Sequence, residues 1–192
     1  MTAVADLSQL IRRNHGTWRG WVRHALGLAD LQLGRLRPFQ AADVAAARRL
    51  VFVCLGNINR SAFACGVARA LGAPVASIGL ATTTGAPATP QACAAAAARG
   101  CDLLPHRATD LADHERRDGD LYVVMEVRHA HRLVAAGIAP RQIVFLGLWG
   151  APARVHLHDP HTLSDEYFAT CFALIDTAVR ALVAAHRAGG RA

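Results

Sequence analysis

Short apolar runs alternate with helical stretches from residue 49 onward, and this alternation is the strongest constraint on the fold. Four short runs are expected to be buried strands: Leu50–Val53, Val75–Ile78, Leu121–Met125 and Gln142–Leu146. Four longer stretches favour helices: Ser61–Leu71, Pro90–Arg99, Glu126–Ala136 and Asp165–His186. Strands separated by helices favour a parallel sheet that is covered on both sides. We therefore predict an α/β fold with a four-stranded parallel sheet and helices on both faces.

The first 49 residues have a different pattern and predict a helical N-terminal extension. A short helix is expected over Leu7–Arg13, and a longer one over Thr17–Leu36, where apolar residues recur at near-helical spacing. Pro38 is expected to end the longer helix, because the residue before a proline is disfavoured in a helix. The sequence thus predicts two regions, a helical extension over 1–49 and a single domain over 50–192.

The charge of the chain is concentrated in this extension and says little about the domain. The formal net charge is +7, and all basic residues apart from histidines are arginines, with no lysine. Because these arginines are not interleaved with stacking aromatics in a recognised module, no nucleic-acid partner is predicted. The hydrophobic fraction of 53% and the charged fraction of 18% favour a globular protein over a disordered one.

The five cysteines and the apolar runs favour a cytoplasmic location. The cysteines are odd in number and irregularly spaced, which argues against a disulfide framework and suits a reducing compartment. We see neither a secretory signal nor an uninterrupted apolar run of the roughly 18–20 residues that a membrane span requires.

A loop of distinctive composition directly follows the first predicted strand. It begins at Cys54, contains Gly56, which permits a tight backbone, and reaches Arg60 and Ser61 where a helical pattern starts. Backbone N–H groups and the positive end of the helix dipole converge on such a loop, which favours a bound anion and a thiolate at Cys54. The planar guanidinium of Arg60 can hold two phosphate oxygens at once, which lysine cannot do. These residues predict a phosphate-binding loop with a cysteine nucleophile.

The surroundings of this loop carry a family resemblance. The stretch Val51–Ser61 resembles the signature loop of the low-molecular-weight protein-tyrosine phosphatases. Further segments resemble that family in the same order along the chain: Val75–Gly79, Gly100 with Pro105–Ala108, Asp120–Glu126, and Asp159-Pro160 followed by Asp165–Tyr167. The resemblance covers residues 50–188 and leaves the extension unexplained.

The resemblance implies a site and a reaction. It implies that Cys54 attacks phosphorus, that Arg60 binds the phosphate, and that Asp159 is the general acid and then the base. It also implies that the backbone amides of the loop form the phosphate cradle, at Leu55, Gly56, Asn57, Ile58 and Asn59. The hydroxyl of Ser61 is then expected to stabilise the sulfur. The implied reaction is hydrolysis of a phosphomonoester through a phosphocysteine, with a phosphotyrosine protein as substrate and with neither metal nor cofactor.

Four positions bear on the specificity and redox behaviour of the site. Asn59 stands where the family usually has a second cysteine, so the loop lacks the partner for a protective disulfide with the nucleophile. His161 and Thr83 stand where aromatic residues usually help to hold a phenyl ring, which predicts a weaker preference for phosphotyrosine. Ile58 stands where members acting on phosphoarginine tend to have Thr, which favours the tyrosine branch.

Two other functions remain as alternatives. A thiol-dependent arsenate reductase shares the cysteine and arginine loop, and it would require two relay cysteines. Cys93 and Cys101 are candidates by spacing, but they flank an alanine-rich helix, where a packing role is favoured. The second alternative is a weakly active phosphate-binding regulatory module in which the extension is the working part.

The remaining candidates are histidines beside Asp159 and the longer helix of the extension. His156, His158 and His161 are expected to be solvated loop residues rather than metal ligands, since nothing completes a ligand set. The apolar stripe of the helix is expected to pack on the protein itself or on a second copy in a homodimer. Contact of residues 17–36 with an anionic membrane surface is less favoured.

Overall fold

Four parallel strands form the centre of the protein, as predicted. The computed structural model describes residues 2–189 and the side chains of residues 6–189; residues 1 and 190–192, at the outer ends of the two predicted regions, lie outside the described residues. The strands are β1 (Arg49–Cys54), β2 (Val75–Gly79), β3 (Asp120–Val124) and β4 (Ile143–Phe145), in the order β2-β1-β3-β4. All pairs are parallel, so the carboxyl ends of the strands lie at one edge, where ligands bind in such sheets.

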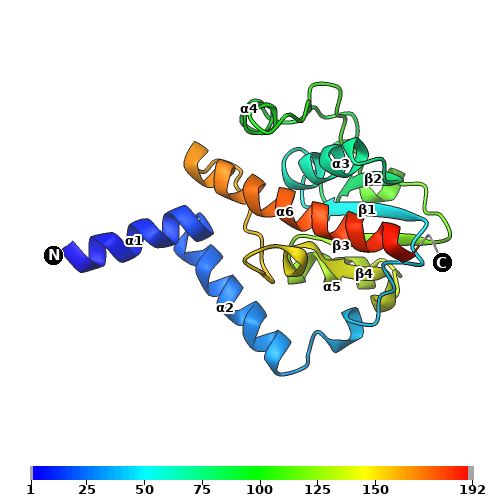
Figure 1. Cartoon of the computed structure of the whole chain (residues 1–192), viewed down its shortest axis with the longest axis horizontal. Coiled ribbons are helices and arrows are strands. Elements are labelled where there is room, and N and C mark those ends of the chain that lie inside the picture. The colour runs from blue at the N-terminus through cyan, green and yellow to red at the C-terminus, as the bar shows by residue number, and fades with distance from the viewer. Residues whose placement is uncertain (1, 190–192) are drawn as a thin grey trace.

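The helices of the domain agree with the predicted ones to within a few residues. They are α3 (Arg60–Ala70), α4 (Pro90–Ala97), α5 (Val127–Ala135) and α6 (Asp165–Gly189), and Figure 1 shows α6 lying across the sheet. The fourth strand is shorter than expected, because 3-10 turns at Pro140–Gln142 and Leu146–Trp149 take up both of its predicted ends.

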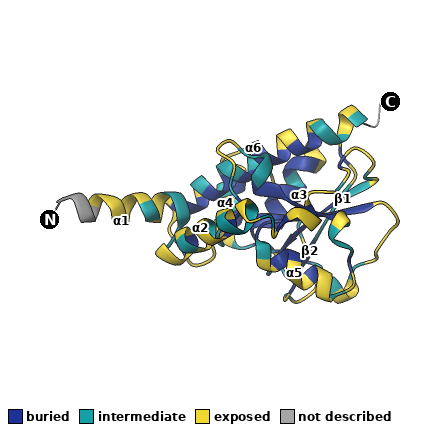
Figure 2. Ribbon diagram, turned by 90° about the horizontal axis from the view of Figure 1, so that it is seen from below, coloured by how far each residue is buried: buried dark blue, intermediate teal, exposed yellow. Residues whose placement is uncertain are grey.

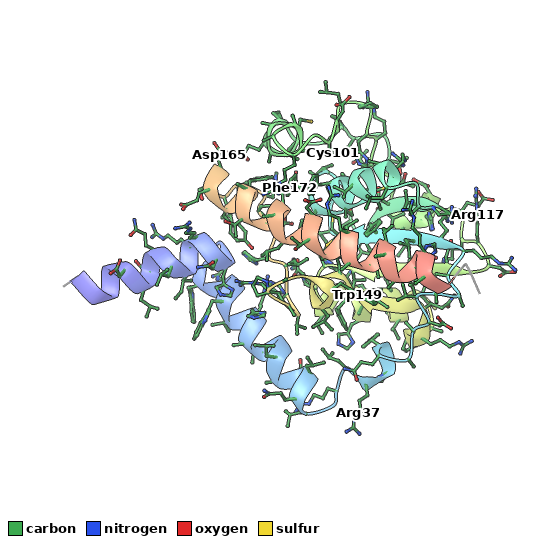
Figure 3. All side chains as sticks on the ribbon, viewed as in Figure 1. Arg37, Cys101, Arg117, Trp149, Asp165 and Phe172 are labelled. Atoms are coloured by element: carbon green, nitrogen blue, oxygen red, sulfur yellow. The ribbon has the colours of Figure 1, made fainter. Side chains whose placement is uncertain are left out.

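Alternate residues of β1 supply two separate cores, one on each face of the sheet. Leu50 and Phe52 point toward α3 and α6, where Phe63 and Phe172 stack with ring centroids 4.2 Å apart. Phe172 is labelled on α6 in Figure 3. Val51 and Val53 point to the opposite face, which is covered by α5 and by the segment that follows α2. Because both faces are covered, the strands are apolar throughout, which is why the sequence shows continuous runs rather than alternation.

The last helix, α6, is long and apolar enough to span a membrane by length and composition alone, a property that it shares with buried core helices of globular proteins. One side of α6 packs into the domain core, with Phe168, Ile175, Val179 and Leu182 at most 1% exposed. Figure 2 shows this buried stripe along the helix. The buried stripe accounts for the apolar composition of the helix by packing within the domain.

The N-terminal extension is helical, as expected, but the longer helix ends earlier. The two helices are α1 (Thr2–His15) and α2 (Trp18–Gln32), and α1 projects from the body of the molecule (Figures 1 and 2). The prediction carried α2 to residue 36, whereas the chain turns at Gly34. This glycine has φ of +72° and donates its N–H to the carbonyl of Leu31, an arrangement that closes a helix C-terminus. Pro38 instead lies in a 3-10 turn at Arg37–Phe39.

The face of α2 that docks on the protein is not the predicted apolar stripe. Trp18 and Trp21 on that stripe are 65% and 45% exposed, and Leu28 is also exposed. The buried residues of α2 are Gly20 and Gly27, which approach His158 and Val155 in the loop before α6. Packing of this stripe on the protein itself is therefore contradicted, because glycine, which weakens a helix, also lets its backbone approach a neighbour closely. Packing of the stripe on a second copy stays a prediction.

Candidate active site

The loop between β1 and α3 has the compact geometry that its sequence predicts. Cys54 is the last residue of β1 and Arg60 is the first residue of α3. Asn57 has φ of +51°, a left-handed conformation that asparagine tolerates better than most residues. Its side chain donates to Ser61 Oγ at 2.8 Å and accepts the N–H of Thr109 at 2.9 Å, so this one residue fixes the loop from inside.

The sulfur of Cys54 lies among hydrogen-bond donors. Ser61 Oγ is 3.0 Å from Sγ, and the backbone N–H of Asn57 donates to Sγ at 3.2 Å. The side chain also lies at the N-terminal end of α3, where the helix dipole favours negative charge. Cys54 is only 2% exposed, so these donors act in a site with little water. The arrangement stabilises a negative charge on sulfur, which is what a nucleophilic thiolate requires.

The guanidinium of Arg60 is fully buried and is held along one edge. Its Nη1 donates to Glu126 Oε1 at 2.6 Å and to the carbonyl of Leu157 at 2.8 Å. On the other edge, Nη2 lies 2.6 Å from Asp159 Oδ2, and Nε has no hydrogen-bond partner among residues 2–189. Burial alone would lower the pKa of Arg60, but the charges of Asp159, Glu126 and Cys54 raise it above its ordinary value. One edge thus remains for an anion.

Asp159 comes from the irregular segment before α6 and meets the loop from the other side of the sheet edge. Its side chain is 27% exposed, and its Oδ1 accepts the N–H of His161 at 3.2 Å. The structure therefore brings the four side chains singled out in the sequence into one site: Cys54, Arg60, Ser61 and Asp159. Leu55, Gly56 and Ile58 lie in the loop that connects Cys54 at the end of β1 with Arg60 at the start of α3.

Asn59 has a clear structural partner in the position where the family usually has cysteine. Its Oδ1 accepts the hydroxyl of Thr89 at 2.6 Å, and Thr89 caps α4 by accepting the N–H of Ala92. The N–H of Thr89 donates to the carbonyl of Ile58 as well. The residue that replaces a cysteine therefore ties the loop to the first turn of α4.

Two buried residues near Arg60, Glu126 and His129, were not singled out in the sequence, and a third, His156, was expected to be solvated. Glu126 follows β3 directly and holds Nη1 of Arg60, while His129 Nε2 and His156 Nδ1 each lie 3.6 Å from its carboxylate. Burial would raise the pKa of Glu126, but Arg60 and the two histidines lower it below the ordinary range. The position of Glu126 could have indicated a role in the site, because a carboxylate at the carboxyl end of a central strand lies at the ligand edge of the sheet.

A further support, also missed, comes from the segment after α4. His106 Nε2 lies 2.6 Å from the carbonyl oxygen of Asn57. Burial is the main reason that the pKa of His106 is below its ordinary value. A neutral imidazole that donates from Nε2 fits this contact and holds the left-handed residue of the loop in place.

The prediction that the histidines beside Asp159 are solvated is wrong for two of the three. His156 is 6% exposed and His158 is half-buried, whereas His161 is exposed. Burial lowers the pKa of His156 to about 3 and lowers the pKa of His158 as well. The alternating spacing put His156 and His158 on the inner side of the loop, against Glu126 and the extension. Thr83 is exposed like His161, and neither residue supplies the aromatic side chain that would help to hold a phenyl ring.

Acid is expected to destabilise the protein through its buried histidines. Burial lowers the pKa of His129 and of His156 to about 3, against 6.5 in an unfolded chain. The unfolded state therefore binds more protons between these values, and stability falls as the pH drops below about 6.5. From pH 7 to pH 5 each histidine should cost about 2 kcal/mol of unfolding free energy. Urea unfolding at both pH values measures this loss, and His129→Gln should reduce the difference by that amount. Equal differences in the variant and the wild type would contradict the assignment.

Cys93 and Cys101 have the packing role that was favoured for them. Both are half-buried and pack against the core cluster on the α3 and α6 side of the sheet. All five cysteines are free, and burial raises the pKa of Cys101 and of Cys65. Neither Cys93 nor Cys101 has the character of an exposed relay thiol next to Cys54.

The fold and the loop together define the class of the protein, a phosphatase built on a cysteine and an arginine at the edge of a parallel sheet. The family model "Low molecular weight phosphotyrosine protein phosphatase" matches residues 49–189. The chain therefore belongs to this family, and the resemblance noted in the sequence is confirmed. The matching model leaves residues 1–48, most of the extension, outside the family domain.

Curated relatives and solved structures agree with this assignment. The chain is 31% identical to the low molecular weight protein-tyrosine-phosphatase Wzb of Escherichia coli strain K12 over 134 residues, which cover 68% of this chain and 90% of Wzb. It is 30% identical to the probable phosphatase EpsP of Ralstonia solanacearum, covering 74% of this chain and 99% of EpsP. The crystal structure of the tyrosine phosphatase AmsI from Erwinia amylovora superimposes with a TM-score of 0.67 at 27% identity, covering 72% of this chain and 93% of AmsI.

Proposed function

We propose that this protein hydrolyses phosphomonoesters of proteins, with phosphotyrosine as the preferred residue, through a phosphocysteine intermediate. The buried Arg60, whose Nε has no hydrogen-bond partner among residues 2–189 and whose guanidinium interacts with the charge of the Cys54 sulfur, is the observation that carries the proposal. Arginine is anchored along Nη1 and offers Nε and Nη2 as a fork that matches two phosphate oxygens. The names of the relatives, which are tyrosine phosphatases, support the choice of substrate.

The proposed reaction has two chemical steps. In the first, the thiolate of Cys54 attacks phosphorus, the S–P bond forms, the P–O bond breaks, and Asp159 gives its proton to the leaving oxygen. In the second, Asp159 takes a proton from water, the water oxygen attacks phosphorus, and the S–P bond breaks to release inorganic phosphate and the thiolate. The backbone amides of residues 55–59 and Arg60 hold the equatorial oxygens throughout.

Binding of the phosphate is expected to release Asp159 for this role. In the structure the carboxylate of Asp159 lies 2.6 Å from Nη2 of Arg60, on the edge that the phosphate needs. A phosphate dianion that takes over this edge displaces the carboxylate, which then faces the leaving oxygen. The carboxylate of Asp159 and the phosphate of the substrate are therefore alternative partners for this edge of Arg60.

Replacement of Asp159 by asparagine should slow the first step according to the leaving group. For phenyl phosphate, whose leaving oxygen is strongly basic, we expect a loss of about 10²–10⁴-fold in the rate constant of phosphoenzyme formation. For a nitrophenyl phosphate, which needs less protonation, the loss should be smaller. Stopped-flow kinetics of both esters under reducing conditions measure the difference, and equal losses would contradict a general-acid role for Asp159.

Phosphopeptides of one sequence test the substrate class. Peptides that carry phosphotyrosine, phosphoserine or phosphothreonine at the same position are compared by kcat/KM. We expect the tyrosine peptide to be hydrolysed best, and we expect a modest margin because Thr83 and His161 supply no aromatic wall. A faster serine peptide would overturn the phosphotyrosine preference while leaving phosphatase activity intact. Arsenate reduction with thioredoxin, measured in parallel, would reveal the alternative chemistry.

We also propose that the protein works in the cytoplasm, since its five cysteines are free and suit a reducing compartment. The division of the chain between residues 49 and 50, and a homodimer, stay predictions.

A further inference from the structure

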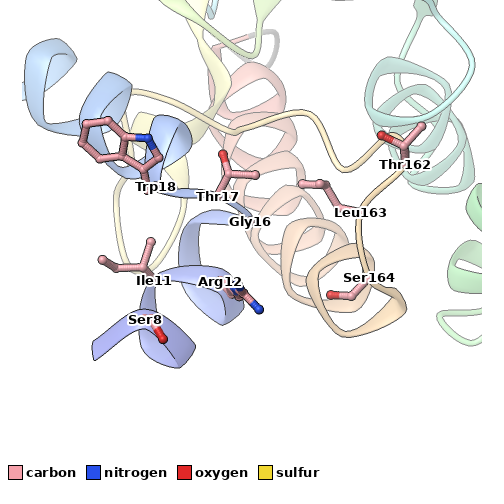
Figure 4. Close-up of a pocket in the computed structure, with 9 residues that line it drawn as sticks. All are labelled: Ser8, Ile11, Arg12, Gly16, Thr17, Trp18, Thr162, Leu163 and Ser164. Carbon is pink, nitrogen blue, oxygen red and sulfur yellow. The ribbon is translucent and has the colours of Figure 1, made fainter. Parts of the chain in front are cut away.

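The corner between α1 and α2 lies against the segment that carries Asp159. Gly16 and Thr17 at this corner and Leu163 of that segment line one groove of about 580 Å³. Figure 4 shows these residues on the elements that carry them. Thr17 Oγ1 lies 3.1 Å from Nε2 of His158, the residue immediately before Asp159. The extension, which lies outside the matched family domain, therefore reaches within one residue of the proposed general acid.

Further contacts of the extension fall on the same segment. Nη1 of Arg154 donates to the carbonyl of Asn14 at 3.1 Å and lies 3.0 Å from Nδ1 of His15. A Cβ added at Gly20 would lie 2.8 Å from Cγ of His158, and one added at Gly27 would lie 3.0 Å from a methyl of Val155. Contacts thus recur from residue 154 to residue 158.

A chain of polar contacts continues inward from Thr17 to Arg60. His158 Nδ1 lies 3.3 Å from His156 Nε2, and His156 Nδ1 lies 3.6 Å from the carboxylate of Glu126. That carboxylate in turn holds Nη1 of Arg60 at 2.6 Å. Four side chains therefore connect the extension with the guanidinium that faces the phosphate site.

The carboxylate of Glu126 fixes the direction of this chain. At 3.6 Å the contact of His156 Nδ1 with the carboxylate is longer than a hydrogen bond, but the negative charge favours an N–H over a lone pair on that side, so Nε2 of a neutral His156 is an acceptor. His158 then donates from Nδ1, and its Nε2 accepts the hydroxyl proton of Thr17. Thr17 Oγ1 keeps a lone pair for the N–H of Gly20, which it accepts at 3.1 Å as the N-cap of α2. The hydrogen bonds between Thr17 and His158 and between His158 and His156 are both consistent with this direction.

We propose that the N-terminal extension is a positioning element of the active site, in which Thr17 holds His158 and thereby the carboxylate of Asp159 and the guanidinium of Arg60. This inference rests on the proposed phosphatase function. Residues 150–164 contain no helix or strand, so the segment beside Asp159 depends on contacts with other elements, such as the hydrogen bonds of the Leu157 N–H with the carbonyl of Met125 and of the Tyr167 hydroxyl with the carbonyl of His158. A general acid must be held within a fraction of an ångström of its target, and the extension supplies this restraint from outside the family domain.

The test removes one hydroxyl group from the full-length protein. Thr17→Val keeps the shape of the side chain but can neither donate to His158 nor cap α2, whereas Thr17→Ser keeps both hydrogen bonds. We expect Thr17→Val to lower the rate constant of phosphoenzyme formation in single turnovers about 10-fold for phenyl phosphate, with a smaller effect for a nitrophenyl phosphate and little change in substrate affinity. Thr17→Ser should restore the wild-type values for both esters.

A control separates positioning from loss of helix stability. Ala25 is exposed on α2, and Ala25→Gly weakens that helix by about 1 kcal/mol without touching the segment before α6. This variant should leave the ratio of the two ester rates unchanged. Equal rate losses for both esters in Thr17→Val, or the same ratio change in Ala25→Gly, would overturn the inference. An inactive wild type would instead overturn the proposed function.

Discussion

Replacement of Cys54 by serine is expected to abolish turnover of every phosphate ester. The donors around Sγ, Ser61 Oγ and the N–H of Asn57, stabilise a thiolate, but a serine hydroxyl keeps its proton at neutral pH and is a poor nucleophile. Loss of the nucleophile in a covalent mechanism costs on the order of 10⁴-fold or more in kcat. Rapid-quench experiments with a radiolabelled aryl phosphate should trap a phosphoenzyme with the wild type and none with the variant.

The matched control for this experiment is Cys93→Ser. Cys93 lies in α4 and is half-buried against the core. The same change of sulfur to oxygen there occurs outside the site. It should form the phosphoenzyme at the wild-type rate. Retained turnover in Cys54→Ser would exclude the phosphocysteine mechanism. Resistance of that turnover to fluoride, or its independence of metal ions, would not restore the phosphocysteine mechanism, because the experiment measures the covalent intermediate itself.

Replacement of Arg60 by methionine should have the second-largest effect, on activity and on stability together. The variant loses the edge that binds phosphate, which should lower kcat/KM by about 10²–10³-fold or more. It also leaves the carboxylate of Glu126 buried without its main partner, because Nη1 of Arg60 contacts it at 2.6 Å. Breaking such a pair costs about 3 kcal/mol, and Arg128, which remains 2.7 Å from the carboxylate, keeps the loss near this lower value.

A second substitution separates the two effects of Arg60→Met. Adding Glu126→Gln removes the buried charge, so the double variant should recover most of the lost unfolding free energy in urea titrations. Its activity should remain as low as that of the single variant, since the phosphate-binding edge is still absent. Recovery of activity in the double variant would show that Arg60 acts only as the partner of Glu126. Unchanged stability in Arg60→Met would show that the ion pair contributes little.

The fold and the centre of the site could be predicted from local patterns. The strand before Cys54, the helix beginning at Arg60 and the Asp159-Pro160 pair each have their own sequence signal, and the structure brings them together at one sheet edge. The four strands were found because covered parallel strands are apolar throughout, which marks them clearly in the sequence. Only their ends differed, where short 3-10 turns replaced the ends of β4.

The surroundings of the site depend on contacts between distant residues and had weaker signals. Glu126 is 66 residues from Arg60, and Thr17 is 141 residues from His158, so no local pattern relates them. Burial of His156 likewise follows from the helix that covers it, not from its neighbours in the sequence. The face of α2 that docks on the domain could not be predicted from the large apolar residues. The buried positions are Gly20 and Gly27, which carry no hydrophobic signal at all.

The glycine face of α2 has a consequence for how this chain can vary. A helix that docks through side chains accepts small replacements at the cost of a cavity, but one that docks through glycines has no smaller residue to accept. At Gly20 an added Cβ meets both the carbonyl of His15 and the ring of His158. Tolerance to substitution along α2 is therefore the reverse of that in a helix whose large residues are buried. The exposed tryptophans should accept many replacements, and the buried Gly20 and Gly27 should accept almost none.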